Sequence, residues 1–376
     1  MTIVYTVSIS RIRENVMQTG IKAFFALALL IVLSIGVLQI PPVQDVLIDK
    51  VIRSRLSTTD RQPLFADDAL RLLVCGSSSP FPDPDRARPC LTVIAGGKFY
   101  VVDTGPGSWN RLALLRIPGD RIGGVFLTHF HSDHIGELGE FNLQTWVAGR
   151  GAPLQVYGPT GVEQVVDGFQ QAYALDRGYR VAHHGAEMLS PDDGLMQAHT
   201  LSLSADGSMT EAFVDGDLKV SVFPVTHTPI SPAVGYRFDY KGRSLVISGD
   251  TIKDANLIRA AKGADLLAHE AQNQQMVGQI QAAAADLGRT RYAKVMADIP
   301  SYHTSPVEAA EVANEAGVPL LLMYHLTPPP PNRIAEMAFL RGVAEIRSKG
   351  VVLAQDGTLI ELPLDGTPAQ VSVLKP

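Results

Sequence analysis

The segment at residues 127–138 concentrates side chains that bind metal ions. It reads LTHFHSDHIGEL and contains His129, His131, Asp133 and His134. Imidazole nitrogens and carboxylate oxygens are good zinc ligands, and the preceding run GGVFLTH is typical of a strand. In an extended loop, His129 and His131 point to the same side because side chains alternate. Asp133 and His134 come one turn later and can face a neighbouring point, so the segment offers ligands for two metal ions.

Three further ligand-type residues stand where predicted strands end. His227 lies in FPVTHTP, Asp250 in VISGDT and His325 in LLLMYHL. A carboxylate has two oxygens, so Asp250 can bridge two ions. We therefore expect a first metal on His129, His131 and His227, a second on Asp133, His134 and His325, and Asp250 with a hydroxide between them. The alternative is a polar loop whose histidines only cap or hydrogen-bond.

Two zinc ions about 3.5–4 Å apart lower the pKa of a bridging water towards about 7, which yields hydroxide at neutral pH. The ions also stabilise negative charge on the attacked centre. Manganese or iron in place of zinc stays open. Asp103, in VVDTGPG, either orients a ligand histidine or serves as a turn residue. The pattern thus predicts a dinuclear metallo-hydrolase.

Composition narrows the partners. The 376 residues carry a net charge of -6 and no block of Lys or Arg, which argues against nucleic acid as a partner. Cys75 and Cys90 are too few for a disulfide scaffold. They fall on neighbouring predicted strands, and whether they form a disulfide stays open. His183 and His184 are expected to be a surface pair because no strand end supports them.

The amino end suggests a membrane segment. Residues 23–40 are 18 residues without a charge, preceded by Arg11, Arg13 and Lys22. That pattern favours a transmembrane signal-anchor over residues 21–40, with residues 1–20 in the cytoplasm and the rest periplasmic or extracytoplasmic. Secretion after signal cleavage is the alternative.

The remaining chain divides into two predicted parts. Residues 41–67 form a juxtamembrane amphipathic helix and a polar linker. Residues 68–376 form one hydrolase domain with mixed strands and helices, an α+β layered sandwich whose loops build the site. A homodimer stays open.

The motifs THFHSDH, VVDTG, VTH, SGDT and YHL, in this order over residues 68–360, resemble the metallo-β-lactamase superfamily. The resemblance implies a four-layer αββα sandwich with a dinuclear site at one edge. The stretches ADLLAHEA and YHTSPVEAAEVANEAG are similar to the ribonuclease Z and arylsulfatase-like branch. That branch has a Glu and a His at these places, which fall here on Glu270 and His303. We expect Glu270 to hold His303, and His303 to donate a proton to the departing oxygen.

Departures from the family's motifs bear on which substrate class the sequence favours. His131 stands where flavodiiron proteins have a Glu, and the basic arm with which ribonuclease Z grips tRNA is not evident between residues 135 and 225. The sequence therefore favours a hydrolase of small sulfate or phosphate esters, with Asp133, Glu270 and His303 as catalytic residues. The alternatives are tRNA 3′-end cleavage as in ribonuclease Z, β-lactam or lactone hydrolysis, and a metal-dependent binding or sensor module.

Overall fold

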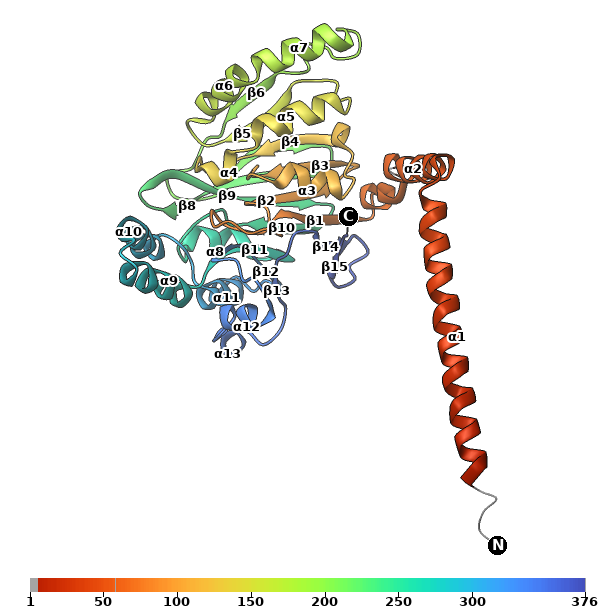
Figure 1. The fold of residues 1–376 in the computed structure, drawn as a ribbon. Helices are drawn as coiled ribbons and strands as arrows, with labels where there is room; N and C mark the ends of the chain where they lie inside the picture. Colours follow the sequence, from red (N-terminus) through yellow and green to blue (C-terminus); the bar gives the residue numbers. More distant parts are fainter. Residues whose placement is uncertain (1–5, 58, 376) are drawn as a thin grey trace. The chain divides into compact units, whose positions relative to one another are not determined.

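The computed structural model describes residues 6–57 and 59–375. The chain divides into two compact units, residues 1–60 and residues 61–376 (Figure 1).

The first unit consists of two helices, α1 (Thr6–Leu38) and α2 (Pro41–Leu56). Within the described residues, neither these helices nor any other is long and apolar enough to cross a membrane. The expected transmembrane signal-anchor over residues 21–40 is therefore wrong, and so is the extracytoplasmic placement that depended on it. The uncharged run was misleading because residues 23–38 of it belong to α1, a helix of 33 residues that also contains the charged segment SRIREN.

The second unit contains two sheets. The first has the strand order β15-β14-β1-β2-β3-β4-β5-β6. In that order its strands are Gln370–Val373, Thr358–Pro363, Ala69–Gly76, Cys90–Ala95, Lys98–Val102, Ile122–Phe126, Leu154–Gly158 and Met196–Thr200. Strands β14 to β3 pair antiparallel, and β3 to β6 pair parallel.

The second sheet has the order β13-β12-β11-β10-β9-β8-β7. Its strands are Val351–Leu353, Leu320–Thr327, Leu266–Gln272, Arg243–Ile247, Ile230–Tyr240, Leu218–His227 and Thr210–Asp215. The segment DYKGR, which is typical of a hairpin turn, joins β9 to β10, with Tyr240 opposite Arg243.

Helices cover the outer faces of both sheets. They are α3 (Ser108–Leu114), α4 (Ser132–Ile135), α5 (Leu138–Val147), α6 (Val162–Ala172), α7 (Ala174–His184), α8 (Ala255–Ala261), α9 (Gln274–Asp286), α10 (Thr290–Asp298), α11 (Pro306–Glu315), α12 (Arg333–Phe339) and α13 (Val343–Ile346). Segments of 3-10 helix lie at η1 (Thr59–Phe65), η2 (Gly119–Arg121) and η3 (Ile299–Ser301).

Strand β1 shows how the sequence builds the layers. Leu72 and Val74 pack between the two sheets, whereas Leu73 and Cys75 pack under the helices α3, α5 and α6. Both sets are fully buried because a strand inside a layered fold hides both of its alternating faces. A third core fills the space between the second sheet and α8, α11 and α12. The second unit is therefore a four-layer αββα sandwich, as the family resemblance implied.

Two local expectations need revision. The apolar spacing of the segment PNRIAEMAFLRGVAEIRSKG predicts one long helix. The structure has two short ones, α12 and α13, because Gly342 between them adopts φ +84°. The predicted polar linker contains Leu64 and Phe65, which are buried in the core under the first sheet.

The open question of the two cysteines is answered by the structure. Cys75 and Cys90 form a disulfide between neighbouring ends of β1 and β2.

Candidate metal centre

The HxHxDH segment follows β4, as expected. His129 and His131 lie on the loop, and His131 is the extended residue that precedes α4. Asp133 and His134 belong to the first turn of α4 and are buried. The change from extended loop to helix turns the second pair towards a different point from the first pair.

The three distant candidates come from the second sheet. His227 ends β8, and Asp250 follows β10. His325 lies inside β12 rather than after it. The register of β12 shifts there, with Glu270 opposite Tyr324 and Ala271 opposite Leu326. His325 is the extra residue of this bulge and adopts φ +48°. A bulge re-aims a side chain, and here it brings the imidazole to the edge where the other ligands lie.

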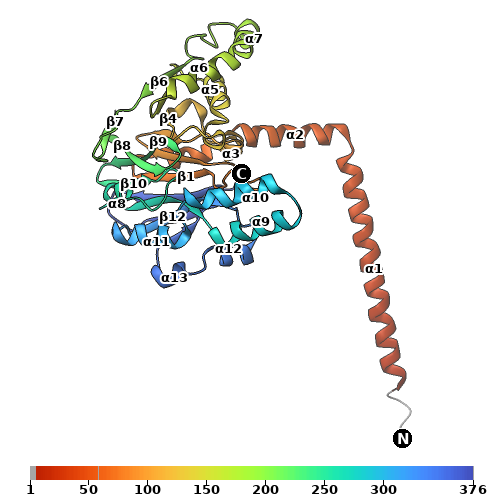
Figure 2. The ribbon, with the colours of Figure 1, turned by 90° about the vertical axis from the view of Figure 1, so that its left-hand side faces the viewer.

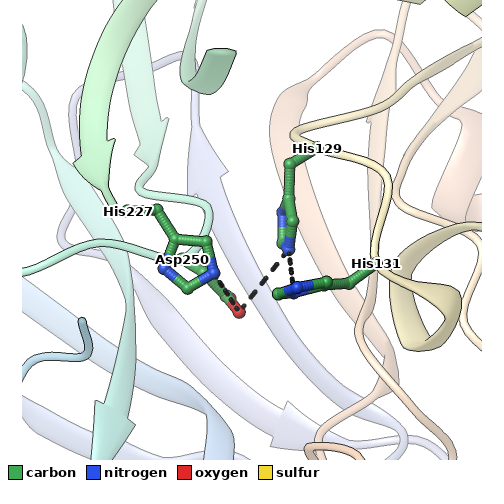
Figure 3. Close-up of side chains that lie close together, drawn as sticks. All are labelled: His129, His131, His227 and Asp250. Carbon is green, nitrogen blue, oxygen red and sulfur yellow. Dashed lines mark hydrogen bonds and ion pairs between the residues drawn. The ribbon is translucent and has the colours of Figure 1, made fainter. Parts of the chain in front are cut away.

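Figure 3 shows the first group, which combines His129, His131, His227 and Asp250. Their ligand atoms all lie within 4.8 Å of one another. The Nε2 atom of His129 is 2.9 Å from Nδ1 of His131. The Asp250 carboxylate oxygen Oδ2 is 3.9 Å from Nε2 of both His129 and His227.

The second group combines Asp133, His134 and His325. Oδ2 of Asp133 lies 3.6 Å from Nε2 of His134 and 3.4 Å from Nε2 of His325. The Asp250 Oδ2 atom is 3.3 Å from both of those imidazole nitrogens. Asp250 therefore stands between the two groups, where a bridging carboxylate would be needed.

Unpartnered buried atoms test whether these residues fit metal ions. The Nε2 atoms of His134, His227 and His325 are buried without a hydrogen-bond partner, and so are Oδ1 of Asp250 and Oδ2 of Asp133. Leaving buried polar atoms unpaired costs about 1–3 kcal/mol each. Five such atoms converging at one edge fit a cluster built to hold cations, because a bound ion would satisfy all of them.

Further hydrogen bonds fix the orientation of two of these imidazoles. His134 donates from Nδ1 to Oδ2 of Asp103 at 2.7 Å, so its Nε2 is free to bind metal. Asp103 also accepts from the backbone N–H and hydroxyl of Thr128. His227 donates from Nδ1 to the carbonyl of Tyr302 at 2.9 Å. Asp103 therefore takes the orienting role that was one of its two sequence interpretations.

The pKa shifts in the cluster favour the deprotonated side chains that bind metal ions, except at His134. Burial lowers the pKa of His129 well below its usual range and that of His227 to about 4. Burial would raise the pKa of Asp250, but the imidazoles of His325 and His134 hold it well below its usual range. At His134 burial is outweighed by Asp250 and Asp103, which raise its pKa well above 6.5. A metal ion must therefore displace a proton from His134.

Glu270 and His303 lie together beside the second group. Glu270 comes from β11 and is fully buried, and His303 precedes α11. Their closest atoms, Oε1 and Nδ1, are 2.8 Å apart. His303 also forms a third possible ligand group with Asp250 and His325.

Sequence reasoning missed the apolar residues around the cluster. Phe81, Met296 and Ile299 line the same pocket as His131 and His303. They come from segments far apart in the chain, and no motif marks them. His183 and His184, in contrast, are exposed at the end of α7 and belong to no ligand group among the described residues.

Comparison with known proteins identifies the family. A family model described as "Metallo-beta-lactamase superfamily" matches residues 85–285. The chain belongs to this superfamily. Ribonuclease Z of Mycobacterium bovis (strain BCG / Pasteur 1173P2) is 37% identical over 262 residues, which are 69% of this chain and 86% of that relative. Ribonuclease Z of Mycobacterium marinum (strain ATCC BAA-535 / M) is also 37% identical and is covered to 87%.

A solved structure extends the comparison to the fold. Human tRNase Z, short form, has a TM-score of 0.56 with this metallo-β-lactamase superfamily member at 20% identity. The likeness covers 78% of this chain and 99% of that one. At this identity it supports the fold alone.

These findings bear on the expected function and partners. The protein is a metal-dependent hydrolase of the metallo-β-lactamase superfamily, and the resemblance to the ribonuclease Z branch is confirmed. The expectation that nucleic acid is not a partner is wrong, because the relatives are named ribonucleases. The expected partners were a small ester and a membrane bound through the anchor. They are contradicted too, by the names of the relatives and by the lack of a membrane-spanning helix among the described residues. The net charge of the whole chain misled because it does not report the chemistry of one site.

Proposed function

We propose that this chain is a ribonuclease Z-type endonuclease that processes the 3′ ends of tRNA precursors. The observation that carries the proposal is the 37% identity to ribonuclease Z of Mycobacterium bovis over 86% of that relative. This substrate takes the place of the small sulfate or phosphate esters that composition favoured.

The proposed cofactor is a pair of zinc ions. The first ion is assigned to His129, His131 and His227, the second to Asp133, His134 and His325, and both to Asp250. When bound, two zinc ions supply a hydroxide nucleophile at neutral pH and stabilise charge on the attacked phosphorus. The unpartnered atoms at this edge of the sandwich support the assignment.

The chain's own residues then hold the ligands and move a proton. Asp103 keeps His134 in one tautomer, and the Tyr302 carbonyl does the same for His227. Glu270 accepts a hydrogen bond from Nδ1 of His303, so the second proton of the imidazolium form of His303 sits on Nε2. From Nε2 this form would protonate the departing ribose oxygen and return to the neutral ring. Glu270 is thus a positioning residue and His303 the proposed general acid.

The direct test uses the full zinc-loaded chain and a tRNA precursor with a 3′ trailer. We expect one cut at the 3′ end of the tRNA and none from the His134→Ala variant. Bis(4-nitrophenyl) phosphate is assayed in parallel to show that the enzyme is active. Hydrolysis of this small diester beside an uncut precursor would contradict the proposed substrate.

Metal analysis tests the cofactor assignment separately. We expect two equivalents of metal per chain in the active enzyme. One equivalent or fewer in a fully active sample would contradict the two-ion assignment.

A further inference from the structure

A pocket of about 130 Å³ opens onto the candidate metal centre. One part of its lining consists of site residues: His131, Asp133, Asp250, His303 and His325. The rest is contributed by Pro80, Phe81, Val295, Met296, Ile299, Tyr302 and Thr327. The part of the pocket beside the candidate metal centre is therefore lined by Phe81 from a loop, by Tyr302, and by apolar residues of α10.

The Phe81 wall is tied to the metal centre. The hydroxyl of Ser78 donates to the carbonyl of Phe81 at 3.3 Å. Ser78 itself pairs with Leu326 in an isolated parallel bridge, and the N–H of Leu326 donates to the carbonyl of Ser77 at 2.9 Å. Leu326 is the neighbour of the proposed ligand His325. The Phe81 loop is thus held in register with the strand that supplies this ligand.

A second part of the apolar lining comes from α10, which lies beside α9 in both views (Figures 1 and 2). Met296 is the buried residue of α10, at 3% exposure. The helix continues through η3 into Tyr302, whose ring packs on the rings of His227 and His303 at 5.1 and 4.9 Å. The α10 lining is therefore connected, through η3 and Tyr302, to His227 and His303 at the candidate metal centre.

Charge and size limit what the pocket can take. The described residues that line it include no lysine or arginine, so it offers no cation for a second phosphate. An apolar cavity of about 150 Å³ is large enough for benzene, and part of this smaller pocket belongs to the metal ligands. The apolar part is thus too small to enclose a ring completely, but the pocket is partly open to solvent, so one planar ring can lie against its apolar lining with its far side exposed. Aromatic and methionine side chains bind such rings by stacking and sulfur contacts.

We propose that Phe81 and Met296 clasp the nucleobase of one nucleotide next to the scissile phosphate, which makes the pocket selective for an unstacked base. The inference rests on the proposed function and names how that function recognises RNA without a basic arm. Base stacking on an aromatic side chain contributes about 1–3 kcal/mol per base, which corresponds to roughly 5- to 150-fold in affinity.

Direct binding tests this inference without any turnover. Calorimetry on the zinc-loaded full chain compares adenosine 5′-monophosphate with ribose 5-phosphate, which has the same phosphate but no base, and with hexyl phosphate, which is apolar but not planar. We expect adenosine 5′-monophosphate to bind at least about fivefold more tightly than either. Phe81→Leu keeps an apolar side chain and removes the ring, so it should lose most of this preference while ribose 5-phosphate binding stays unchanged. Met296→Ala should act in the same direction.

The control variant is Leu287→Ala, at the end of α9. Leu287 is 75% exposed and does not line the pocket, so this variant should keep the full preference. Equal binding of adenosine and ribose phosphates, equal binding of hexyl phosphate, or an unchanged preference in Phe81→Leu would each overturn the inference. An uncut tRNA precursor together with this preference for the base would contradict only the proposed function.

Discussion

Nδ1 of His303 lies 2.8 Å from Oε1 of Glu270, and that oxygen also accepts backbone hydrogen bonds from Thr251 and Thr304. An oxygen that already accepts two N–H groups is the acceptor in the third contact as well, so His303 is the donor. Burial and the charge of Asp250 raise the pKa of Glu270 well above its usual range. Any proton that it takes up belongs on Oε2, which has no partner. Nδ1 of His303 therefore keeps its proton, and Nε2 is the nitrogen that gains and loses the proton of the imidazolium form.

His303→Ala should separate substrates by their leaving group. A general acid contributes about 10²–10⁴-fold to rate, but only where the departing oxygen needs a proton. We expect a loss of that size on RNA or alkyl esters and a much smaller loss on 4-nitrophenyl esters, with metal content unchanged. Glu270→Gln should show the same leaving-group pattern more weakly. Equal losses on both substrates, or loss of metal, would assign His303 to ligation or structure.

Asp103 offers a test of ligand orientation. Removing the partner of a metal-bound histidine usually weakens metal binding by about 10- to 100-fold, so Asp103→Ala should lower zinc affinity by that factor in a competition titration with a chelator. Asp103→Asn is the matched variant, because Asn tolerates the φ of +60° at this position and keeps one acceptor oxygen. Its loss should be smaller. Unchanged affinity in both variants would show that His134 needs no orienting partner.

The stability of the metal-free chain should fall in acid through His269. This imidazole is fully buried, and burial lowers its pKa to about 4, whereas an unfolded histidine titrates near 6.5. The unfolded state therefore binds the proton first, so stability is unaffected above pH 6.5 and is lost as pH falls from about 6.5 to about 4. At pH 5 the loss is about 2 kcal/mol.

Urea unfolding of the metal-free protein at pH 7.5 and pH 5 measures this effect. His269→Gln cannot take up the proton, so the variant should lose about 2 kcal/mol less than the wild type between the two pH values. The ligand histidines protonate in both proteins and cancel in the comparison. Identical losses would mean that another group accounts for the acid sensitivity.

The disulfide between Cys75 and Cys90 should stabilise the fold measurably. It spans a sequence separation of 15, for which loop closure predicts about 3 kcal/mol. It also closes the base of the loop that carries Phe81. In urea unfolding, a chain with Cys75→Ala and Cys90→Ala together should have a free energy of unfolding lower than that of the oxidised wild type by about this amount. Two titratable thiols and equal gel mobility with and without reductant would show that the bond does not form.

The sequence was informative where chemistry follows local rules. The HxHxDH spacing and the strand ends located the seven residues of the first two ligand groups, because ligand types are rare at such places. The position of His325 inside β12 was not predictable, since a bulge depends on the register of the neighbouring strand. The pocket walls were equally hidden, because Phe81 and Met296 meet only through tertiary structure.

Other predictions were wrong because the stretch of sequence that was considered did not match the extent of the structural element or site. The uncharged run before Ile40 resembled a membrane span although it is part of the longer helix α1. The helical periodicity after Pro331 continued through Gly342, but one residue with a left-handed backbone ended the helix. The net charge of -6 is a property of the whole chain and does not determine which partner binds at one site.

The proposed ligands are divided between the two sheets, and this division sets an order in time. His129, His131, Asp133 and His134 follow β4 in the first sheet, whereas His227, Asp250 and His325 belong to the second. A ribosome releases the first set well before the last strand that contributes a ligand, β12. A nascent chain therefore offers only four of the seven proposed ligands until the strands of the second sheet have assembled beside the first sheet. We therefore expect metal capture to be one of the last events of folding, so that a tightly held pair of ions would mark a completely folded molecule.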